Sequence, residues 1–459
     1  MEAFKIEGDE ELAKHPAVRG GDGSPDDPYR ISDLLVIQDQ VYGLWLANVT
    51  SHVVIQNVIV DGSKLATTET VRCTTDTGDC GLTRGLFLNN VTDATVRDVR
   101  LEDQFWGVLV SESGSVNMKR VELGFPATRT LNPLSNETAT ATTFTRGFDV
   151  SNTGELALEN VTIGDARVTF SARNMERLEL TNTEFNGRSS EAIVQNVREV
   201  EVSQSVFSKV QLLVEEQSEN VTIVGSKFAE SPGVAMRVHA RTDAPSVELI
   251  RVCGSFIQKS TGNEALDLSR TKRVEVIGAT FEDTGGGIQA PDASEGIEVR
   301  HSSITNTSGP GLLLKGSGME VHNNSIAGNG DASILEAHEW GNASHNWWGD
   351  PDGPDIKFEE GPGDGDDLWP PVNVTFRPFL SGPPETGPSA VDCRGSGTDP
   401  GVKAEPSIPV AAHAGVGIEH TVNVNEKIAD RRVKEKAKVK AEAEASIGPV
   451  AIPTDPLPE

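Results

Sequence analysis

Positive charge is scarce in this chain. Lys and Arg together number 40, against 69 Asp and Glu, and the formal charge is −29. Nucleic-acid phosphates require a basic surface, so the composition argues against a nucleic-acid partner. Molar salt screens charges over a few ångströms. We therefore expect a protein adapted to a very salty environment.

Long apolar runs are also missing. No stretch of about 18 apolar residues occurs, so we expect no membrane span. The N-terminus has no apolar signal region, which is consistent with a protein released by lysis, as virion parts are. Gly-x-Ser-x-Gly, His-Glu-x-x-His and phosphate-loop motifs are absent as well. The sequence therefore shows no motif of the common hydrolases, metalloproteases or nucleotide-binding enzymes.

Cysteine is the third scarce residue, with four in 459 positions. No Cys-x-x-Cys or Cys/His cluster suggests zinc. Cys73 and Cys80 flank a short polar loop, and we expect either a disulfide between them or two free thiols. Cys253 and Cys393 have no evident partner in the sequence.

What the chain does contain is an internal repeat. Each copy reads apolar, any residue, apolar, two residues, a small or branched residue, any residue, apolar. Most copies follow one another after 21–24 residues, and two steps are close to 40. A degenerate twelfth copy ends near His345 and Trp348. The second apolar residues of the eleven clear copies are Ile55, Val96, Met118, Leu158, Leu180, Val202, Ile223, Val252, Val276, Val299 and Val321.

The repeat predicts the fold. Alternation with a period of two indicates strands, and strands this short cannot stand alone. A step of about 22 residues is too short for a crossover helix, but it suits a coil of three short strands stacked about 4.8 Å from the next coil. Small residues such as Thr183, Ser205 and Ser226 suit a tight interior corner. We therefore expect an all-β, right-handed parallel β-helix of about twelve coils.

These coils resemble the repeats of the pectate-lyase-like and NosD-like β-helix families. The segment Asn346-Trp-Trp-Gly-Asp-Pro-Asp-Gly-Pro354 resembles one that often ends such repeats in archaeal surface proteins. The resemblance covers residues 30–380. It implies the β-helix fold but no single activity, because these families include lyases, hydrolases, phage tailspikes and non-catalytic surface proteins.

The repeat also predicts the domain organisation. A solenoid needs capped ends, and residues 1–33 are expected to form the N-terminal cap of a β-helix at 34–380. Insertions at 61–84 and 122–146 are the natural recognition loops. Residues 381–409 form a Pro/Gly-rich linker. In residues 410–459 apolar and polar residues alternate, which favours a β-hairpin, but the segment also contains strong helix formers. We expect this segment to be an assembly element, either as a hairpin or as a helix.

Several charged residues are candidates for chemistry. Glu298 and Glu320 fall at the same outward position of consecutive coils, and Arg300 and His322 lie beside them. Close carboxylates raise each other's pKa or recruit cations, so this group is the candidate catalytic site. The alternative is a solvated acidic face of a halophilic protein.

The other candidate sites lie near the C-terminal end or in an insertion. Asp350, Asp352 and Asp355 form a candidate calcium site or a plain acidic loop, and no cofactor is required. Trp340, Trp347 and Trp348 could stack on sugar rings or plug the last coil. Asn136, one of nine Asn-x-Ser/Thr sequons, is the clearest glycosylation candidate.

Two functions follow as expectations. The first is a non-enzymatic structural or attachment protein, such as a spike, fibre or turret component, on a halophilic virus or cell surface. Its partners would be further copies, with a trimer favoured, or other surface subunits bound through residues 403–459, together with host glycans or a surface protein. The alternative is an extracellular polysaccharide lyase or glycosidase that acts along the β-helix wall.

Overall fold

The computed structural model describes residues 1–63, 83–125, 130–131, 139–140, 145–215, 217–239, 247–331, 333–356, 365–369, 372–390 and 393. The chain divides into two units, Met1–Ala404 and Glu405–Glu459. All described residues belong to the first unit. The predicted assembly element at 410–459 therefore lies outside them, as do most residues of the two predicted insertions.

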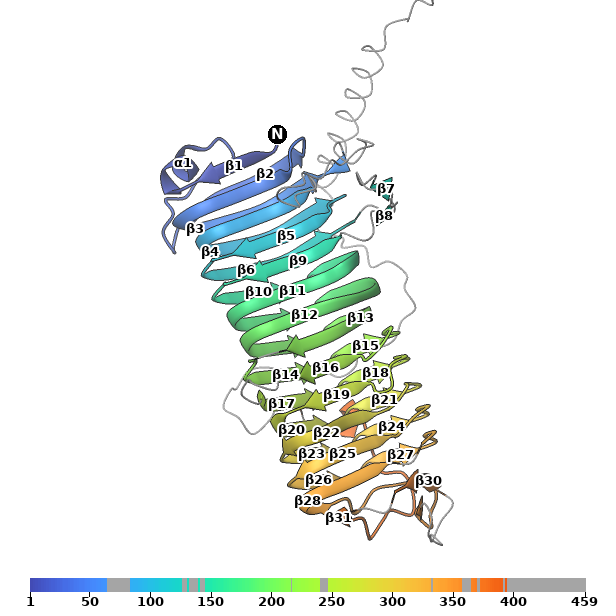
Figure 1. Cartoon of the computed structure of the whole chain (residues 1–459). Helices are drawn as coiled ribbons and strands as arrows, with labels where there is room; N and C mark the ends of the chain where they lie inside the picture. The colour runs from blue at the N-terminus through green and yellow to red at the C-terminus, as the bar shows by residue number, and fades with distance from the viewer. Residues whose placement is uncertain are drawn as a thin grey trace, which may run out of the picture. The chain divides into compact units, whose positions relative to one another are not determined.

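The first unit is a parallel β-helix, as the repeat predicts (Figure 1). Nearly all described strands join one sheet of 27 strands, in which each strand pairs in parallel with its equivalent one coil further along. The second apolar residues of the repeat form one continuous ladder, from Ile55 opposite Val96 to Val299 opposite Val321. The periodicity therefore predicted the strand register as well as the fold.

The ladder of the repeat defines a first wall. Its strands are β2 (Tyr29–Ile37), β3 (Tyr42–Asp61), β4 (Arg84–Glu102), β6 (Ser115–Leu123), β10 (Glu155–Glu159), β11 (Thr162–Thr181), β12 (Glu184–Ser203), β14 (Asn220–Val224), β17 (Val247–Cys253), β20 (Thr271–Ile277), β23 (Ile297–Arg300) and β26 (Met319–His322). The long strands β3, β4, β11 and β12 continue around corners into the neighbouring walls.

A second wall begins at the glycines that precede many of its strands. It contains the first halves of β3 and β4, together with β1 (Phe4–Glu7), β5 (Trp106–Ser111), β9 (Arg146–Ser151), β13 (Val206–Glu215), β16 (Met236–His239), β19 (Leu266–Ser269), β22 (Ile288–Glu295), β25 (Leu312–Ser317) and β28 (Ile334–Asn342). The third wall has short strands after β14: β15 (Lys227–Ala229), β18 (Phe256–Gln258), β21 (Thr280–Glu282), β24 (Ser303–Thr305) and β27 (Ser325–Ala327).

The interior combines apolar stacks with a polar corner. The buried rings of Phe185, Phe207 and Phe228 are stacked with centroids 4.6 and 4.7 Å apart. The corner residues predicted from their small size, such as Ser205 and Ser226, are fully buried. There the backbone N–H of one coil donates to the side-chain oxygen of the next, as from Ser205 to Ser226 Oγ at 3.2 Å. These bonds satisfy backbone groups that the turn would otherwise leave unpaired.

Both ends of the solenoid are closed. At the N-terminal end β1 already pairs with β3, and Leu12 of helix α1 (Asp9–Lys14) is buried in the core. The first coil thus begins inside the range 1–33 that was predicted to be only a cap. At the other end Trp348 is buried. It is followed by β29 (Pro354–Ile356), β30 (Gly365–Leu368) and β31 (Val372–Thr375), the last strand among the described residues. Apart from these elements, the described residues include the short pair β7 (Thr130–Leu131) and β8 (Ala139–Thr140) and the 3-10 helix η2 (Pro388–Ala390).

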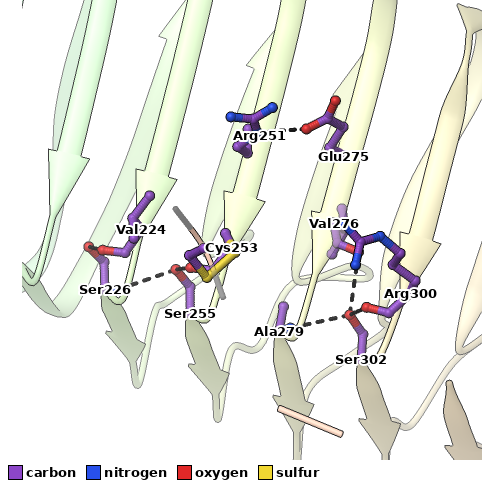
Figure 2. The surroundings of a disulfide bond; sticks show 11 residues. Val224, Ser226, Arg251, Cys253, Ser255, Glu275, Val276, Ala279, Arg300 and Ser302 are labelled. Atoms are coloured by element: carbon purple, nitrogen blue, oxygen red, sulfur yellow. Dashed lines mark hydrogen bonds and ion pairs between the residues drawn. A yellow bond between two sulfur atoms is a disulfide. The ribbon is translucent and has the colours of Figure 1, made fainter. Parts of the chain in front are cut away.

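The chain then returns along the outside of the solenoid. Cys393 forms a disulfide with Cys253 on β17, 140 residues earlier (Figure 2). Before it, the N–H of Gly387 donates to the carbonyl of His301 at 2.8 Å. The described part of the predicted linker therefore lies against the coils. We call residues 381–390 together with Cys393 the strap.

Candidate functional site

The wall carboxylates are brought into register, as the sequence predicted. Glu275 on β20, Glu298 on β23 and Glu320 on β26 occupy equivalent positions on consecutive strands. Arg300 and His322 are also directly opposite each other. The structure thus brings the four predicted catalytic residues onto two neighbouring strands.

Each carboxylate of this column, however, has its own partner within the protein. Glu298 Oε1 accepts from Arg300 Nε at 2.5 Å, and Glu320 Oε2 accepts from Asn342 Nδ2 at 3.0 Å. Arg300 is therefore an ion-pair partner of the predicted acid. Both contacts use the carboxylates as hydrogen-bond acceptors on the wall.

Glu275 shows the same arrangement in a buried setting. Its side chain pairs with Arg251 Nε at 2.6 Å and with Arg273 Nη2 at 2.6 Å, and the residue is 2% exposed. Figure 2 shows the Arg251–Glu275 pair near the disulfide. A buried charge is stable only when it is paired in this way. This end of the column is therefore structural.

The strap explains why outward residues are buried here. Cys253 and Ile277 occupy equivalent, outward positions of β17 and β20, yet they are only 1% and 7% exposed. A Cβ added to Gly254 would lie 3.1 Å from Cys393 Sγ and 3.7 Å from Pro388 Cβ. The strap therefore packs closely on this corner. The sequence offered no local signal for the disulfide, since its two cysteines are far apart in the chain.

A hollow of about 570 Å³ lies at a different corner of the same coils. Its lining comes from four consecutive turns and consists of hydroxyl, amide and glycine residues, such as Thr261 and Asn306, and the carboxylate Asp283. None of the four predicted catalytic residues lines it. Sequence reasoning missed this hollow because it arises from turns between strands and not from the strands of the repeat.

A half-buried carboxyl, that of Asp366, stands close to the hollow. Asp366 accepts hydrogen bonds from the backbone N–H groups of Gly328 (2.7 Å) and Asn329, and from Asn329 Nδ2 (2.6 Å). Burial raises the pKa of Asp366, although the hydrogen bonds from Asn329 act in the opposite direction. Asp366 thereby ties the loop after Trp348 to the last turns of the third wall.

The three predicted sugar-binding tryptophans do not form one surface. Trp348 is fully buried, Trp347 is half-buried, and Trp340 on β28 is 56% exposed. Stacking of Trp348 on a sugar is thus excluded, because its ring fills the end of the core. The alternative interpretation, a plug for the last coil, is correct for this residue.

In the acidic turn at the C-terminal end, Asp350 and Asp355 already have contacts within the protein. The backbone N–H of Asp352 donates to Asp350 Oδ1 at 2.8 Å. Asp355 on β29 is the strand partner of Asp367 on β30, through the backbone. Within the described ranges, no three His, Cys, Asp or Glu residues are grouped so that they could hold a metal ion. Calcium binding at Asp350, Asp352 and Asp355 stays a prediction without a formed cluster. Cys73, Cys80 and Asn136 lie outside the described residues.

One surface was not anticipated from the sequence. Tyr42, Arg84, Trp106 and Arg146 are in register where β3, β4, β5 and β9 begin, and Trp45 and Phe87 lie beside them on β3 and β4. We call these six residues the aromatic row. The signal was present: Trp45 and Phe87 occupy the position between two core residues in Leu-Trp-Leu and Leu-Phe-Leu. At that position an aromatic ring faces away from the core.

Comparisons with protein-family models, curated proteins and solved structures found no match for this chain. No helix among the described residues is long and apolar enough to cross a membrane. The function must therefore be argued from the geometry.

Proposed function

We propose that this chain is a structural or attachment protein of a halophilic virus particle or cell surface, with the β-helix as a rigid body. The observation that carries the proposal is the pairing of the wall carboxylates. Glu275, Glu298 and Glu320 are held by arginines or an asparagine, and none of them lines the hollow. A wall of this kind stabilises a solenoid, and the partners of these three carboxylates occupy the groups that acid–base catalysis on this wall would need.

The disulfide supports a location outside the cytosol. Disulfides persist mainly in secreted, surface and virion proteins. The Cys253–Cys393 bond closes a long segment of the chain and joins the strap to the wall. Together with the formal charge of −29, this favours an extracellular setting in high salt.

The test is the solution mass by light scattering in about 3 M salt, a concentration at which surface charges are screened. The full chain is compared with a truncation after residue 402, which keeps Cys393. We expect an oligomer, with a trimer favoured, that becomes a monomer on truncation because residues 403–459 join the copies. A monomer in both cases, purified from cytoplasm and absent from particles and surfaces, contradicts the proposal.

A polysaccharide lyase or glycosidase is the second candidate. The observation in its favour is that Glu298, Glu320, Arg300 and His322 lie together on β23 and β26. It predicts cleavage of acidic polysaccharides and loss of that activity in Glu298→Gln and Glu320→Gln. If no product forms from a panel of such polymers in molar salt, this candidate fails.

A further inference from the structure

The aromatic row occupies two outward columns on the same four strands. Figure 1 shows β3, β4, β5 and β9 side by side near the N-terminal end. The first column alternates rings and cations, in the order Tyr42, Arg84, Trp106 and Arg146. The second column is apolar except on its last strand, in the order Trp45, Phe87, Leu109 and Asp149. Neighbouring members of a column are separated by the spacing of paired strands, about 4.8 Å.

The faces of these rings are already used inside the row. The rings of Trp45 and Phe87 are stacked with centroids 5.3 Å apart. Trp106 lies between two guanidinium groups, that of Arg84 at 4.9 Å and that of Arg146 at 5.3 Å from the ring centroid. These contacts order the side chains in the absence of a partner. What remains for a partner is a preformed surface of ring edges and apolar side chains.

Charges beside the row are paired within the protein. Arg146 pairs with Asp149 at 2.7 Å, and Lys5, which lies over the ring of Trp45, pairs with Glu7 at 2.7 Å. The whole chain has a formal charge of −29, so two copies repel each other. A patch with paired charges and apolar residues is a place where that repulsion is weak.

The row also has the composition and exposure of a protein contact. All six of its residues and Leu109 are half-buried, whereas core residues of the same strands, such as Leu88 and Val108, are buried. Trp, Tyr and Arg contribute most to protein–protein contacts, above all at the centre of the contact. The outward column of the first wall instead carries glutamates on three consecutive strands.

The order of residues in the first column is complementary to a reversed copy of itself. When two rows face each other in opposite directions about a two-fold axis between β4 and β5, β4 faces β5 and β3 faces β9 of the second copy. Arg84 then meets Trp106 of the second copy, and Arg146 meets Tyr42. Two rows in the same direction would place each arginine against its own equivalent, and like charges in contact are unfavourable. The alternation therefore favours the reversed arrangement.

The second column fits the same axis. Phe87 faces Leu109 of the second copy next to the axis, so an apolar pair lies at the centre of the contact, where side chains contribute most. Asp149 faces Trp45 of the second copy at the edge and keeps its partner Arg146. Rows in the same direction would instead bring two copies of Asp149 together.

We infer that the aromatic row is a contact between two copies of this chain, whose N-terminal coils overlap in opposite directions about a two-fold axis. The overlap includes β1, β3, β4, β5, β9 and β11, which are consecutive on the second wall. Strands spaced by about 4.8 Å and about 20 Å long bury roughly 1,100 Å² in total over this overlap, just above what a specific interface needs. The contact does not involve residues 403–459 and therefore goes beyond the proposed function.

The first test is the mass of the full chain by light scattering in about 3 M salt, which screens the repulsion between copies. An interface of this size dissociates in the micromolar range, so the mass is compared at about 1 µM and about 100 µM protein. We expect it to rise at least about twofold. Leu109→Glu places a carboxylate against Phe87 of the second copy and should weaken the association at least about tenfold.

The matched control is Leu313→Glu. Leu313 on β25 occupies the same outward column as Leu109, further along the solenoid and outside the overlap, and it is also half-buried. Its substitution should leave the association unchanged. Each variant is first checked for an unchanged melting transition.

The second test establishes the direction of the two copies. In a background in which Cys73 and Cys80 are replaced by Ser, Tyr42→Cys chains are mixed with Arg146→Cys chains and oxidised. The reversed arrangement brings these two positions together, whereas equal positions lie about 14 Å apart along the solenoid, beyond the reach of a disulfide. We expect cross-linked pairs in the mixture and few with either variant alone.

Three results would each overturn the inference: a mass that is equal at both concentrations, equal effects of Leu109→Glu and Leu313→Glu, or self-cross-linking of either variant as efficient as that of the mixture. Failure of the proposed function is a separate result. At about 1 µM the row contact is dissociated, so the effect of truncation after residue 402 depends on residues 403–459 alone. An oligomer joined through those residues, with a mass independent of concentration, keeps its structural role and loses this contact.

Discussion

Single residues at the interior corner determine how one coil is joined to the next. The side chains of Ser205, Ser226 and Ser255 accept the N–H of the preceding coil, and further along Asn324 and Asn346 take over. The asparagines also donate, from Asn324 Nδ2 to Val299 O and from Asn346 Nδ2 to Val321 O. A buried N–H without an acceptor costs about 1–3 kcal/mol, so the identity of each corner residue matters.

Asp366 gives a pH-dependent prediction at this scale. Burial raises its pKa above 3.8, so the folded protein retains this proton at pH values where the unfolded chain has lost it. Its contribution to the free energy of unfolding is therefore greatest below the unfolded pKa and is lost as the pH rises through the raised folded pKa. Asp366→Asn removes this titration. The free energy of unfolding of both proteins is measured in urea at constant salt. The value for the parent minus the value for the variant should fall as the pH rises from about 4. A difference that is flat or rises across this window contradicts the prediction.

At the scale of elements, the glycine that begins a second-wall strand permits the close approach of two coils. A Cβ on Gly107 would lie 2.7 Å from the carbonyl oxygen of Gly147 and 2.3 Å from a methyl carbon of Leu123. Gly85 and Gly287 have equivalent close contacts with the carbonyls of Gly107 and Gly311. The recurrence of glycine at this position, visible in the sequence, thus has a steric cause.

This contact predicts the effect of Gly107→Ala. The clash involves backbone of the next coil and cannot be relieved by a rotamer change, so we expect a loss of about 1–3 kcal/mol or more in the free energy of unfolding. Gly382→Ala is the matched control, because nothing lies within 4 Å of its added Cβ. It should change stability by less than about 1 kcal/mol. Denaturant unfolding of both variants checks this, and equal stabilities would show that the coils yield at this corner.

At the scale of the whole molecule, the strap joins the C-terminal end of the solenoid to its middle. A repeat protein is held together by contacts between neighbouring coils, so its terminal coils can unfold separately. The Cys253–Cys393 bond connects positions 140 residues apart and restrains all coils between them. It should therefore protect the last coils most.

Cys393→Ser tests this role, in a background in which Cys73 and Cys80 are replaced by Ser so that only one disulfide is altered. Closing a loop of this length stabilises a protein by about 2–5 kcal/mol, and we expect a loss of that order. Hydrogen exchange should accelerate in the coils after β17 more than in those before it. A reductant should lower the melting temperature of the background protein and leave the variant unchanged; a reductant effect of equal size in both would argue against the strap.

The sequence by itself determined the parallel β-helix, its register and its inward residues. Residues such as Ile55, Val96 and Met118 repeat at a spacing that corresponds to one coil, and burial of apolar side chains is a local consequence of strand alternation. The column of Glu298 and Glu320 was predictable for the same reason.

Only the tertiary structure decided that these carboxylates are paired, that Trp348 fills the core, that Cys253 bonds Cys393 and that Tyr42, Arg84, Trp106 and Arg146 form one row. These features depend on how the coils are aligned after insertions of different length, and on the path that the chain takes outside the coils after the last strand of the solenoid. The physical reason is that periodicity specifies neighbours one coil apart, whereas partners separated by a return of the chain are chosen by packing in three dimensions.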